Sequence, residues 1–140
     1  MILLDVNVWL ATVWRGHRHH DTARQWFQDQ DDDLALCRVT QMSLLRLLSN
    51  PSIMREDALS RAQAWDVVDA LAADDRVVFA EEHDELELRW RALSARDDQS
   101  HKLWTDDYLA AFALAAGFSF ATLDRAIADR YPALAVTLVG

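Results

Sequence analysis

Residues that break or cross-link a fold are scarce in this 140-residue sequence: it holds one cysteine, two prolines and three glycines. The lone Cys37 excludes an internal disulfide, which fits a reducing compartment, and we expect a cytoplasmic protein. With hydrophobic residues at 51% of the chain, the composition favours a compact, helix-rich globule over a disordered chain. No apolar run is long enough to span a membrane. The N-terminus also lacks the basic flank and long apolar stretch of a signal peptide.

Positive charge is scarce as well. Lys and Arg total 14 against 23 Asp and Glu, which gives a formal net charge of −9. This balance argues against a broad nucleic-acid-binding face. It still allows an enzyme that binds nucleic acid locally through a metal ion and a few cations, and it suits a basic protein partner. No linker, repeat or low-complexity segment divides the chain, so we expect one domain over residues 1–140.

Strand and helix patterns alternate along the chain. Short apolar runs predict five strands, at residues 2–4, 34–39, 77–79, 118–122 and 135–139. Apolar residues at helical spacing predict helices at 8–11, 21–29, 41–48, 56–73, about 86–93 and 108–116. We expect Thr40 to cap the helix at 41–48, Gly117 to end the last helix, and residues 95–102 to form a loop. The alternation predicts an α/β fold in three layers, with helices on both faces of a mostly parallel sheet.

Three aspartates stand where this fold places ligands. Asp5 follows the first predicted strand, and Asp124 follows the strand at 118–122. Asp106 opens the helix before that strand, and because this helix runs antiparallel to the strand, its start lies at the strand's carboxyl end. Ligands of open parallel sheets bind at this edge. Clustered carboxylates repel one another, and the usual remedy is a hard divalent cation with oxygen ligands. The sequence therefore predicts a metal site.

Each of these acids also has a purely structural reading. Asp106 and Asp124 could cap helices, and Asp5 could end its strand in an Asx-turn. The joint placement of all three at one sheet edge favours the metal site. A cluster of His17, His19 and His20 could also ligate a metal, but it lacks a partnering cysteine or carboxylate pattern, so a polar turn is favoured there.

Three segments carry a resemblance to a known family. Residues 3–8 (LLDVNV), 105–111 (TDDYLAA) and 121–125 (ATLDR) resemble the anchor motifs of PIN-domain ribonucleases. The chain as a whole resembles the VapC toxins of bacterial type II toxin–antitoxin pairs. The resemblance implies a PIN-like fold and an endoribonuclease that uses Mg²⁺, or Mn²⁺, held by clustered acids. It also implies an antitoxin that blocks the site, and a homodimer.

The resemblance assigns roles residue by residue. Asp5, Asp106 and Asp124 become the catalytic metal-site acids, and Asn7 and Thr122 become supporting polar residues. The chemistry agrees with these roles, because a bound divalent ion stabilises charge on a phosphate and activates a water. RNA contacts are expected from a few local cations rather than a broad basic face: Arg46, Lys102 and Arg125, with Arg15, Arg18 and Arg38 as further candidates.

One feature departs from the family pattern. Most PIN nucleases have a glutamate on the helix after the second strand, whereas this chain has no acid between Leu34 and Ser52. We expect a three-aspartate site in which a water, Gln41 or Ser43 replaces the missing ligand. Arg46 either pairs with one of the site acids Asp5 and Asp106, or binds an RNA phosphate, or is a surface arginine on an amphipathic helix.

Two other functions remain open at this point. A haloacid-dehalogenase-like phosphatase would use Asp5 as its nucleophile, but that family has a second aspartate where this chain has Asn7, and neither its glycine–threonine pair nor its usual lysine is evident. A PIN-like module that has lost catalysis and only binds a partner is the other alternative. A metal-dependent nuclease assay with an Asp5→Asn control separates these readings.

Overall fold

The structure, a computed structural model of residues 1–140, is built on a five-stranded sheet. The strands are β1 (Ile2–Leu4), β2 (Leu34–Leu36), β3 (Val77–Phe79), β4 (Ser119–Thr122) and β5 (Val136–Leu138). All neighbouring strands are parallel, in the order β3-β2-β1-β4-β5. The chain leaves β1 to one side for β2 and β3, and then returns to the other side for β4 and β5. The carboxyl ends of β1 and β4 therefore flank the topological switch point, where open α/β sheets bind ligands.

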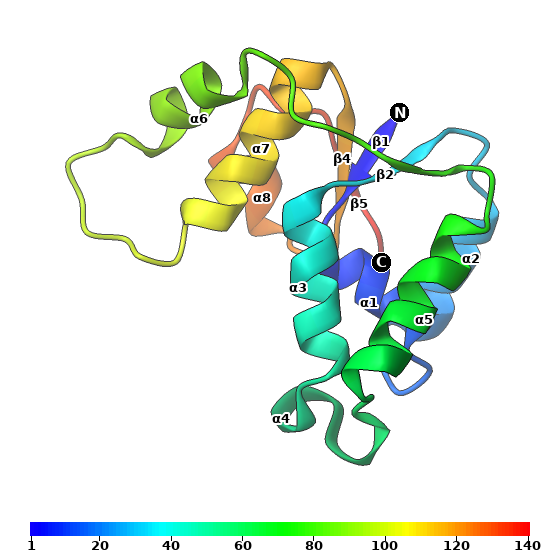
Figure 1. The fold of residues 1–140 in the computed structure, drawn as a ribbon. Helices are drawn as coiled ribbons and strands as arrows, with labels where there is room; N and C mark the ends of the chain where they lie inside the picture. The colour runs from blue at the N-terminus through cyan, green and yellow to red at the C-terminus, as the bar shows by residue number, and fades with distance from the viewer.

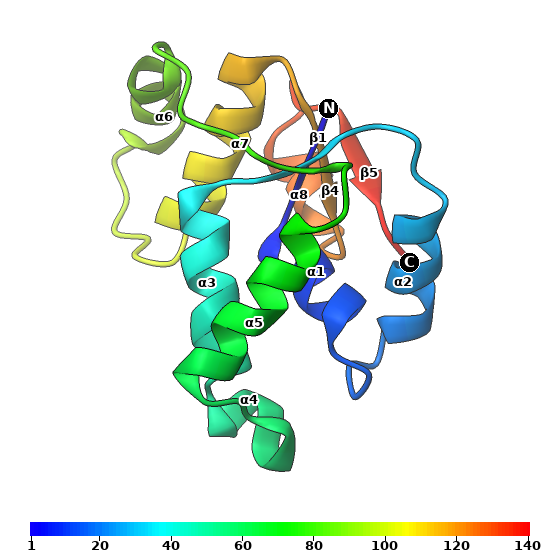
Figure 2. The same cartoon turned by 45° about the vertical axis from the view of Figure 1, so that its right-hand side comes forward.

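Helices cover both faces of this sheet (Figure 1). One side carries α1 (Val6–Val13), α2 (His20–Gln28), α3 (Arg38–Leu48) and α5 (Arg61–Ala72), while α6 (Leu86–Ser94), α7 (Trp104–Ala116) and α8 (Ala126–Arg130) lie on the other. Helices α3 and α5 run side by side, and the short α4 (Pro51–Met54) with the 3₁₀ turn η1 (Arg55–Asp57) lies at their far end (Figure 2). The α/β fold with helices on both faces is confirmed, and the sheet is wholly parallel.

The buried core is divided between these two faces. Successive side chains of a strand point to opposite faces, so Ile2 and Leu4 pack among α1, α2, α3 and α5, while Leu3 packs against α7. All three residues are buried. On the α1 side, the rings of Trp9 and Phe27 meet edge to face at 6.1 Å between centroids. The apolar run that predicted β1 reflects this burial on both faces.

The predicted start of α3 is wrong by three residues. The helix begins at Arg38 with Cys37 as its N-cap, so β2 ends at Leu36 instead of reaching Val39. Thr40 stands inside the first turn, where its hydroxyl accepts a hydrogen bond from the Cys37 backbone N–H at 3.0 Å. Thr40 therefore does help to cap the helix, but it binds the N–H of the N-cap residue from a position inside the first turn.

The single helix predicted over 56–73 is also wrong. Residues 55–57 form η1, and α5 begins only at Arg61. Ser60 is its N-cap: the Ser60 hydroxyl accepts from the Gln63 N–H, and the Gln63 side chain accepts from the Ser60 N–H. This reciprocal pair satisfies two backbone donors and sets the helix start.

Two local predictions hold. Gly117 follows α7 in the left-handed conformation with φ of 73°, which glycine adopts without the steric cost of a side chain. The polar stretch between α6 and α7 contains no helix or strand and swings away from the sheet (Figure 1). No helix of the structure has both the length and the apolar content needed to cross a membrane.

Candidate active site

Asp5 lies at the switch point of the sheet and is almost enclosed. It follows β1 and serves as N-cap of α1, and its Oδ1 accepts a hydrogen bond from the Val6 N–H at 2.8 Å. Its Oδ2 accepts from the Thr122 hydroxyl, also at 2.8 Å. Only 8% of Asp5 is exposed. Both carboxylate oxygens are thus held before any ligand arrives.

Thr122, the last residue of β4, joins several parts of the site. Its hydroxyl donates to Asp5, accepts from the Asp124 N–H at 3.0 Å, and lies 3.5 Å from Asn7 Nδ2. Asn7 in turn accepts from the Leu123 N–H through its Oδ1 at 3.2 Å. These contacts tie the segment after β1 to the segment after β4. Asn7 and Thr122 therefore orient Asp5 and the chain that carries Asp124.

The other two predicted acids are more open. Asp106 lies in the first turn of α7, and its Oδ2 forms an ion pair with Arg130 Nη1 at 3.0 Å. About a third of each of these two side chains is exposed. Asp124 is exposed in the turn between β4 and α8, and its Oδ1 accepts from the Ala126 N–H at 2.9 Å. This bond lies in the turn before α8, whose N-cap is Arg125 without a side-chain capping bond, so Asp124 is not the N-cap of this helix.

The three carboxylates share one electrostatic neighbourhood. Burial raises the pKa of Asp5 from 3.8 to about 6; the Thr122 hydrogen bond opposes that rise, and the nearby charges of Asp106 and Asp124 add to it. Burial also raises the pKa of Asp106, against the lowering effect of Arg130 and with a further rise from Asp124. The structure thus brings the three acids together at the carboxyl edge of the sheet.

The donor chemistry of this cluster fits a hard divalent cation, since all of its ligating atoms would be oxygens. A cation would also offset the unfavourable charge of the buried Asp5. In the described side-chain arrangement, however, no three His, Cys, Asp or Glu groups are placed to hold one ion together. Asp106 is turned to Arg130, and Asp124 is turned to a backbone N–H. Asp5 is fixed in place, whereas Asp106 and Asp124 would have to rotate in order to share one ion with it.

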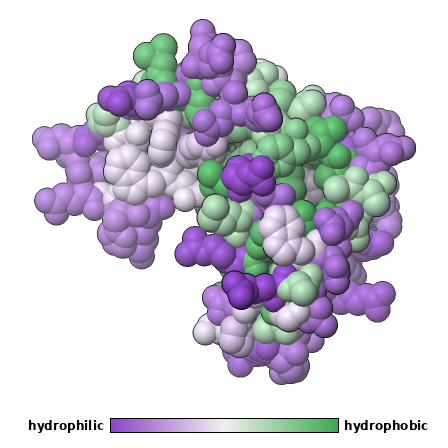
Figure 3. Space-filling model, in the orientation of Figure 1, coloured by the Kyte–Doolittle hydropathy of each residue, from purple (hydrophilic) through white to green (hydrophobic).

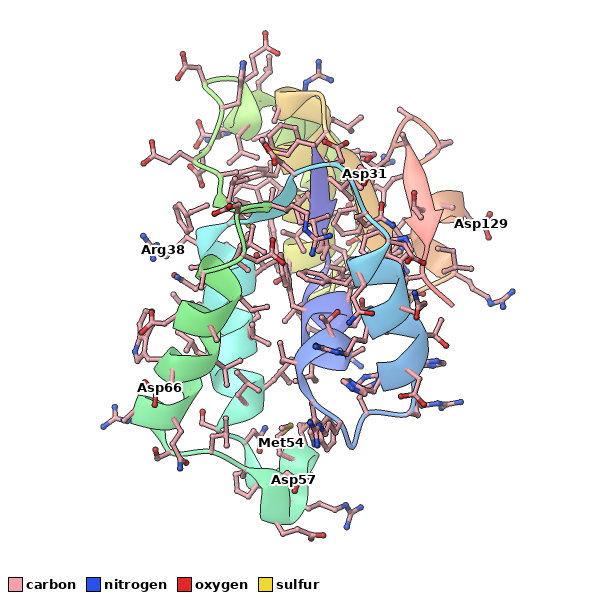
Figure 4. All side chains as sticks on the ribbon, turned by 90° about the vertical axis from the view of Figure 1, so that its right-hand side faces the viewer. Asp31, Arg38, Met54, Asp57, Asp66 and Asp129 are labelled. Carbon is pink, nitrogen blue, oxygen red and sulfur yellow. The ribbon has the colours of Figure 1, made fainter.

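Helix α3 contributes no charged group to this cluster. Arg46 is exposed and makes no ion pair, so of its three predicted alternatives the pairing with Asp5 or Asp106 is absent. Asp106 pairs with Arg130, and Asp5 accepts from Val6 and Thr122. Gln41 Oε1 accepts a hydrogen bond from Arg38, whose side chain points outward at the start of the helix (Figure 4). Ser43, half-buried on the same helix, makes no side-chain hydrogen bond.

The remaining candidates lie at the surface or in turns. Lys102 and Arg125 are exposed and make no ion pair. His20 Nδ1 lies 2.7 Å from the carbonyl oxygen of Ala11, and His17 Nδ1 accepts from the His19 N–H at 3.0 Å. These contacts are those of a polar turn, and no metal-binding group forms there.

Two contacts between α7 and the end of α8 were not predicted from the sequence. Consecutive acids of α7 meet consecutive residues at the end of α8: Asp106 pairs with Arg130, and the Tyr131 hydroxyl donates to Asp107. Burial, followed by this hydrogen bond, raises the pKa of Tyr131. The only signal in the sequence is the equal separation of 24 residues in both pairs. Asp107 is buried in this contact, in keeping with its exclusion from the predicted metal site.

The fold and this acid cluster match a known class of protein. A family model described as "PIN domain" matches residues 2–132. Ribonuclease VapC41 of Mycobacterium tuberculosis is 42% identical over 132 residues, covering 90% of either chain. Ribonuclease VapC29 of the same organism is 34% identical over 137 residues, covering 98% of this chain and 96% of that protein. The chain therefore belongs to the PIN-domain family and, within it, to the VapC ribonucleases.

Solved structures share the fold at low sequence identity. VapC20 of Mycobacterium tuberculosis, described as a Sarcin-Ricin loop cleaving toxin, superposes with a TM-score of 0.69 at 17% identity, covering 92% of this chain and 94% of that one. VapBC2 of Rickettsia felis, bound to a promoter DNA fragment, gives a TM-score of 0.71 at 14% identity over the whole of both chains. The family match displaces the phosphatase alternative.

Proposed function

We propose that this chain, a VapC ribonuclease toxin, cleaves RNA phosphodiester bonds with a divalent metal ion held by Asp5, Asp106 and Asp124. Mg²⁺ is the proposed ion, with Mn²⁺ as an alternative. PIN-domain nucleases typically use such ions. The observation that carries the proposal is the buried Asp5 carboxylate, fixed at the switch point with two further carboxylates close enough to raise its pKa.

When bound, the ion would stabilise charge on the phosphate and acidify a water. The residues of the chain prepare the place for it. Thr122 and the Val6 N–H hold both oxygens of Asp5 in position. Asp106 and Asp124 complete the oxygen donors once they turn from Arg130 and Ala126. Arg130, released from Asp106, is then free to meet an RNA phosphate.

The missing glutamate sets an expectation for metal affinity. Helix α3 offers only neutral oxygens, and Gln41 is already engaged with Arg38. Three carboxylates are enough for Mg²⁺, which usually keeps several of its waters. With one negative ligand fewer, we expect activity at higher Mg²⁺ concentrations or a preference for Mn²⁺.

The proposed partners are a cognate antitoxin and a second copy of the chain. Met42 on α3, Ile53 on α4 and Trp65 on α5 are 53%, 43% and 48% exposed. In Figure 3, residues of intermediate and weakly hydrophobic character lie among the hydrophilic ones over this part of the molecule. Large exposed apolar side chains gathered on neighbouring elements are typical of protein interfaces. The antitoxin should place an Arg or Lys near the acids, in the position that Arg130 occupies at Asp106.

A nuclease assay on defined single-stranded RNA tests the proposed activity. The purified chain is incubated with Mg²⁺, with Mn²⁺ or with EDTA, and the RNA ends are sequenced. Cleavage should require the metal and should be lost in Asp5→Asn. If the chain neither cleaves nor binds metal, and a Ser43→Glu or Leu44→Glu variant gains both properties, the native chain is a PIN-like binding module instead.

A further inference from the structure

A cavity of about 680 Å³ is lined in part by Arg130, the ion-pair partner of Asp106. It is enclosed by the end of α6, the 95–103 loop, the first turn of α7 and the end of α8. Its lining mixes apolar and polar groups and includes His101, Leu103, Trp104, Asp107, Arg130 and Tyr131. Ligand sites of small organic groups are clefts of about this size, with a few placed polar groups in a partly apolar wall.

Trp104 is the one tryptophan that lines this cavity. It is 56% exposed although it begins a helix whose following turns are buried. Trp90 supports it from behind: the two rings meet edge to face at 6.3 Å between centroids, and Trp90 Nε1 donates to the Trp104 carbonyl oxygen at 3.3 Å. Trp90 is itself packed edge-on against Tyr108 at 5.4 Å. Trp104 thus combines an exposed aromatic surface with a supporting contact to Trp90, which lowers the cost of ordering the side chain on binding.

Arg130 connects the cavity to the site acids. It lines the cavity, and its Nη1 pairs with Asp106. Trp104 and Asp107 stand three residues apart on α7 and share the cavity face, while Asp106 lies between them in sequence. A group held against Trp104 would therefore be adjacent to the metal-binding edge. Its neighbours His101 and Ser100 in the loop offer hydrogen-bonding side chains.

We propose that this cavity binds one unpaired base of the RNA substrate, next to the cleaved phosphate, with Trp104 stacked on the base. The proposal rests on the ribonuclease function proposed above. Single-stranded RNA is recognised in part by stacking of splayed bases on aromatic side chains, and stacking itself needs no positive charge. It accounts for an exposed tryptophan beside a site with few cations.

Binding of a short fluorescent RNA in EDTA tests the cavity separately from cleavage. Loss of a base–aromatic stack weakens affinity by about 5- to 100-fold, so Trp104→Ala should raise the Kd of an eight-nucleotide RNA by about that factor. Trp104→Phe, which keeps an aromatic face, should restore most of the affinity. Leu88→Ala is the control, because Leu88 is 72% exposed on α6 and does not line the cavity. Circular dichroism confirms that each variant is folded.

An abasic scan of the same RNA makes the test specific. Removing the stacked base should weaken binding to the wild type at one position, and should have no further effect on Trp104→Ala. Equal effects of every abasic position on both proteins would overturn the proposal. So would a Trp104→Ala variant that keeps RNA affinity but loses the antitoxin, since the cavity would then be a protein-docking surface. If the base-specific binding is present but no metal supports cleavage, the proposed function fails and the cavity assignment stands.

Discussion

The two halves of the acid cluster differ in how firmly they are held. Asp5 is buried, and its two oxygens are fixed by the Val6 N–H and the Thr122 hydroxyl. Asp106 and Asp124 are more exposed, and each is turned to a partner of its own: Arg130 for Asp106 and the Ala126 N–H for Asp124. If these acids hold a cation as proposed, Asp5 is already in place for it, and Asp106 and Asp124 have to leave their present partners.

This difference follows from where each acid stands. Asp5 and Thr122 close the ends of two adjacent parallel strands, so the sheet itself sets their distance. Asp106 and Asp124 stand in a helix turn and a loop, where rotation of one side chain is enough to change partner. Because of this division, substitutions in the fixed half should have larger effects than substitutions in the mobile half.

The largest effect is expected for Asp5→Asn. Removing one group that stabilises charge in a transition state costs about 10²- to 10³-fold in rate, and Asp5 is the only acid fixed before metal binding. Initial rates of RNA cleavage at saturating Mn²⁺ measure this loss. Asp129→Asn is the matched control, because it makes the same change of charge on α8, where Asp129 points away from the body of the protein (Figure 4). Comparable losses in both variants would contradict a special role for Asp5.

The same Asp5→Asn variant should be more stable than the wild type at neutral pH without metal. The folded-state pKa of Asp5, about 6, lies above its ordinary value of 3.8, so between these values the folded protein keeps a proton that the unfolded chain has lost. The wild type therefore loses stability as the pH rises through this window, and the loss is complete above pH 6. At about 1.4 kcal/mol per pKa unit it amounts to about 3 kcal/mol.

Urea unfolding in EDTA at pH 4.5 and pH 7.5 measures this difference. The free energy of unfolding of Asp5→Asn minus that of the wild type should be larger at pH 7.5 than at pH 4.5. A constant difference would show that Asp5 is not perturbed in the folded state.

Thr122→Val tests the link between the two strand ends. The change keeps the shape but removes the hydroxyl, which leaves the Asp124 N–H without an acceptor and Asp5 Oδ2 without a donor. Loss of a group that orients a metal ligand weakens affinity by about 10- to 100-fold, and a buried unpaired group costs about 1–3 kcal/mol of stability. Mn²⁺ titration calorimetry and thermal unfolding measure the two effects. Thr122→Ser keeps the hydroxyl and should retain most of the metal affinity.

The smallest effect is expected in the mobile half, for Arg130→Gln. A partly exposed ion pair is worth about 0.2–1 kcal/mol, so freeing Asp106 should tighten Mn²⁺ binding by only about 2- to 5-fold. Titration with Mn²⁺ in the absence of RNA measures metal binding alone, so a contact between Arg130 and a phosphate cannot contribute. Arg125→Gln removes the same charge from an unpaired side chain and should leave the metal affinity nearly unchanged. Weaker metal binding in Arg130→Gln would show that Arg130 supports the site instead of competing for Asp106.

The sequence predicted the parts of the fold that depend on local pattern. The apolar runs of β1 and β3 were predicted to the residue, and Gly117 marked the end of α7. Placing Asp5, Asp106 and Asp124 at one edge needed only the rule that parallel strands end together. The start of α3 was misplaced because a threonine can cap a helix in two ways: as the residue before the first turn, or from inside the first turn. Thr40 does the second.

What the sequence could not predict are contacts between distant side chains. Arg130 pairs with Asp106 across 24 residues, and no periodicity marks either one as the partner of the other. Arg46 carries the same charge and was considered as a partner of Asp106, yet its place on α3 leaves it exposed. The orientation of an ion pair depends on how α7 and α8 pack, which emerges only from the assembled fold.

The hydrogen bond between Thr122 and Asp5 also limits how early in folding the site can form. It joins residues 117 positions apart in the chain, and β1 pairs with β4 across the same interval. Contacts this remote form late, because the entropy of closing a long loop must be overcome first. During synthesis, which proceeds from the N-terminus, Asp5 therefore stays without its hydroxyl partner until β4 has been made. A ribosome that is still translating this chain thus carries only an incomplete nuclease.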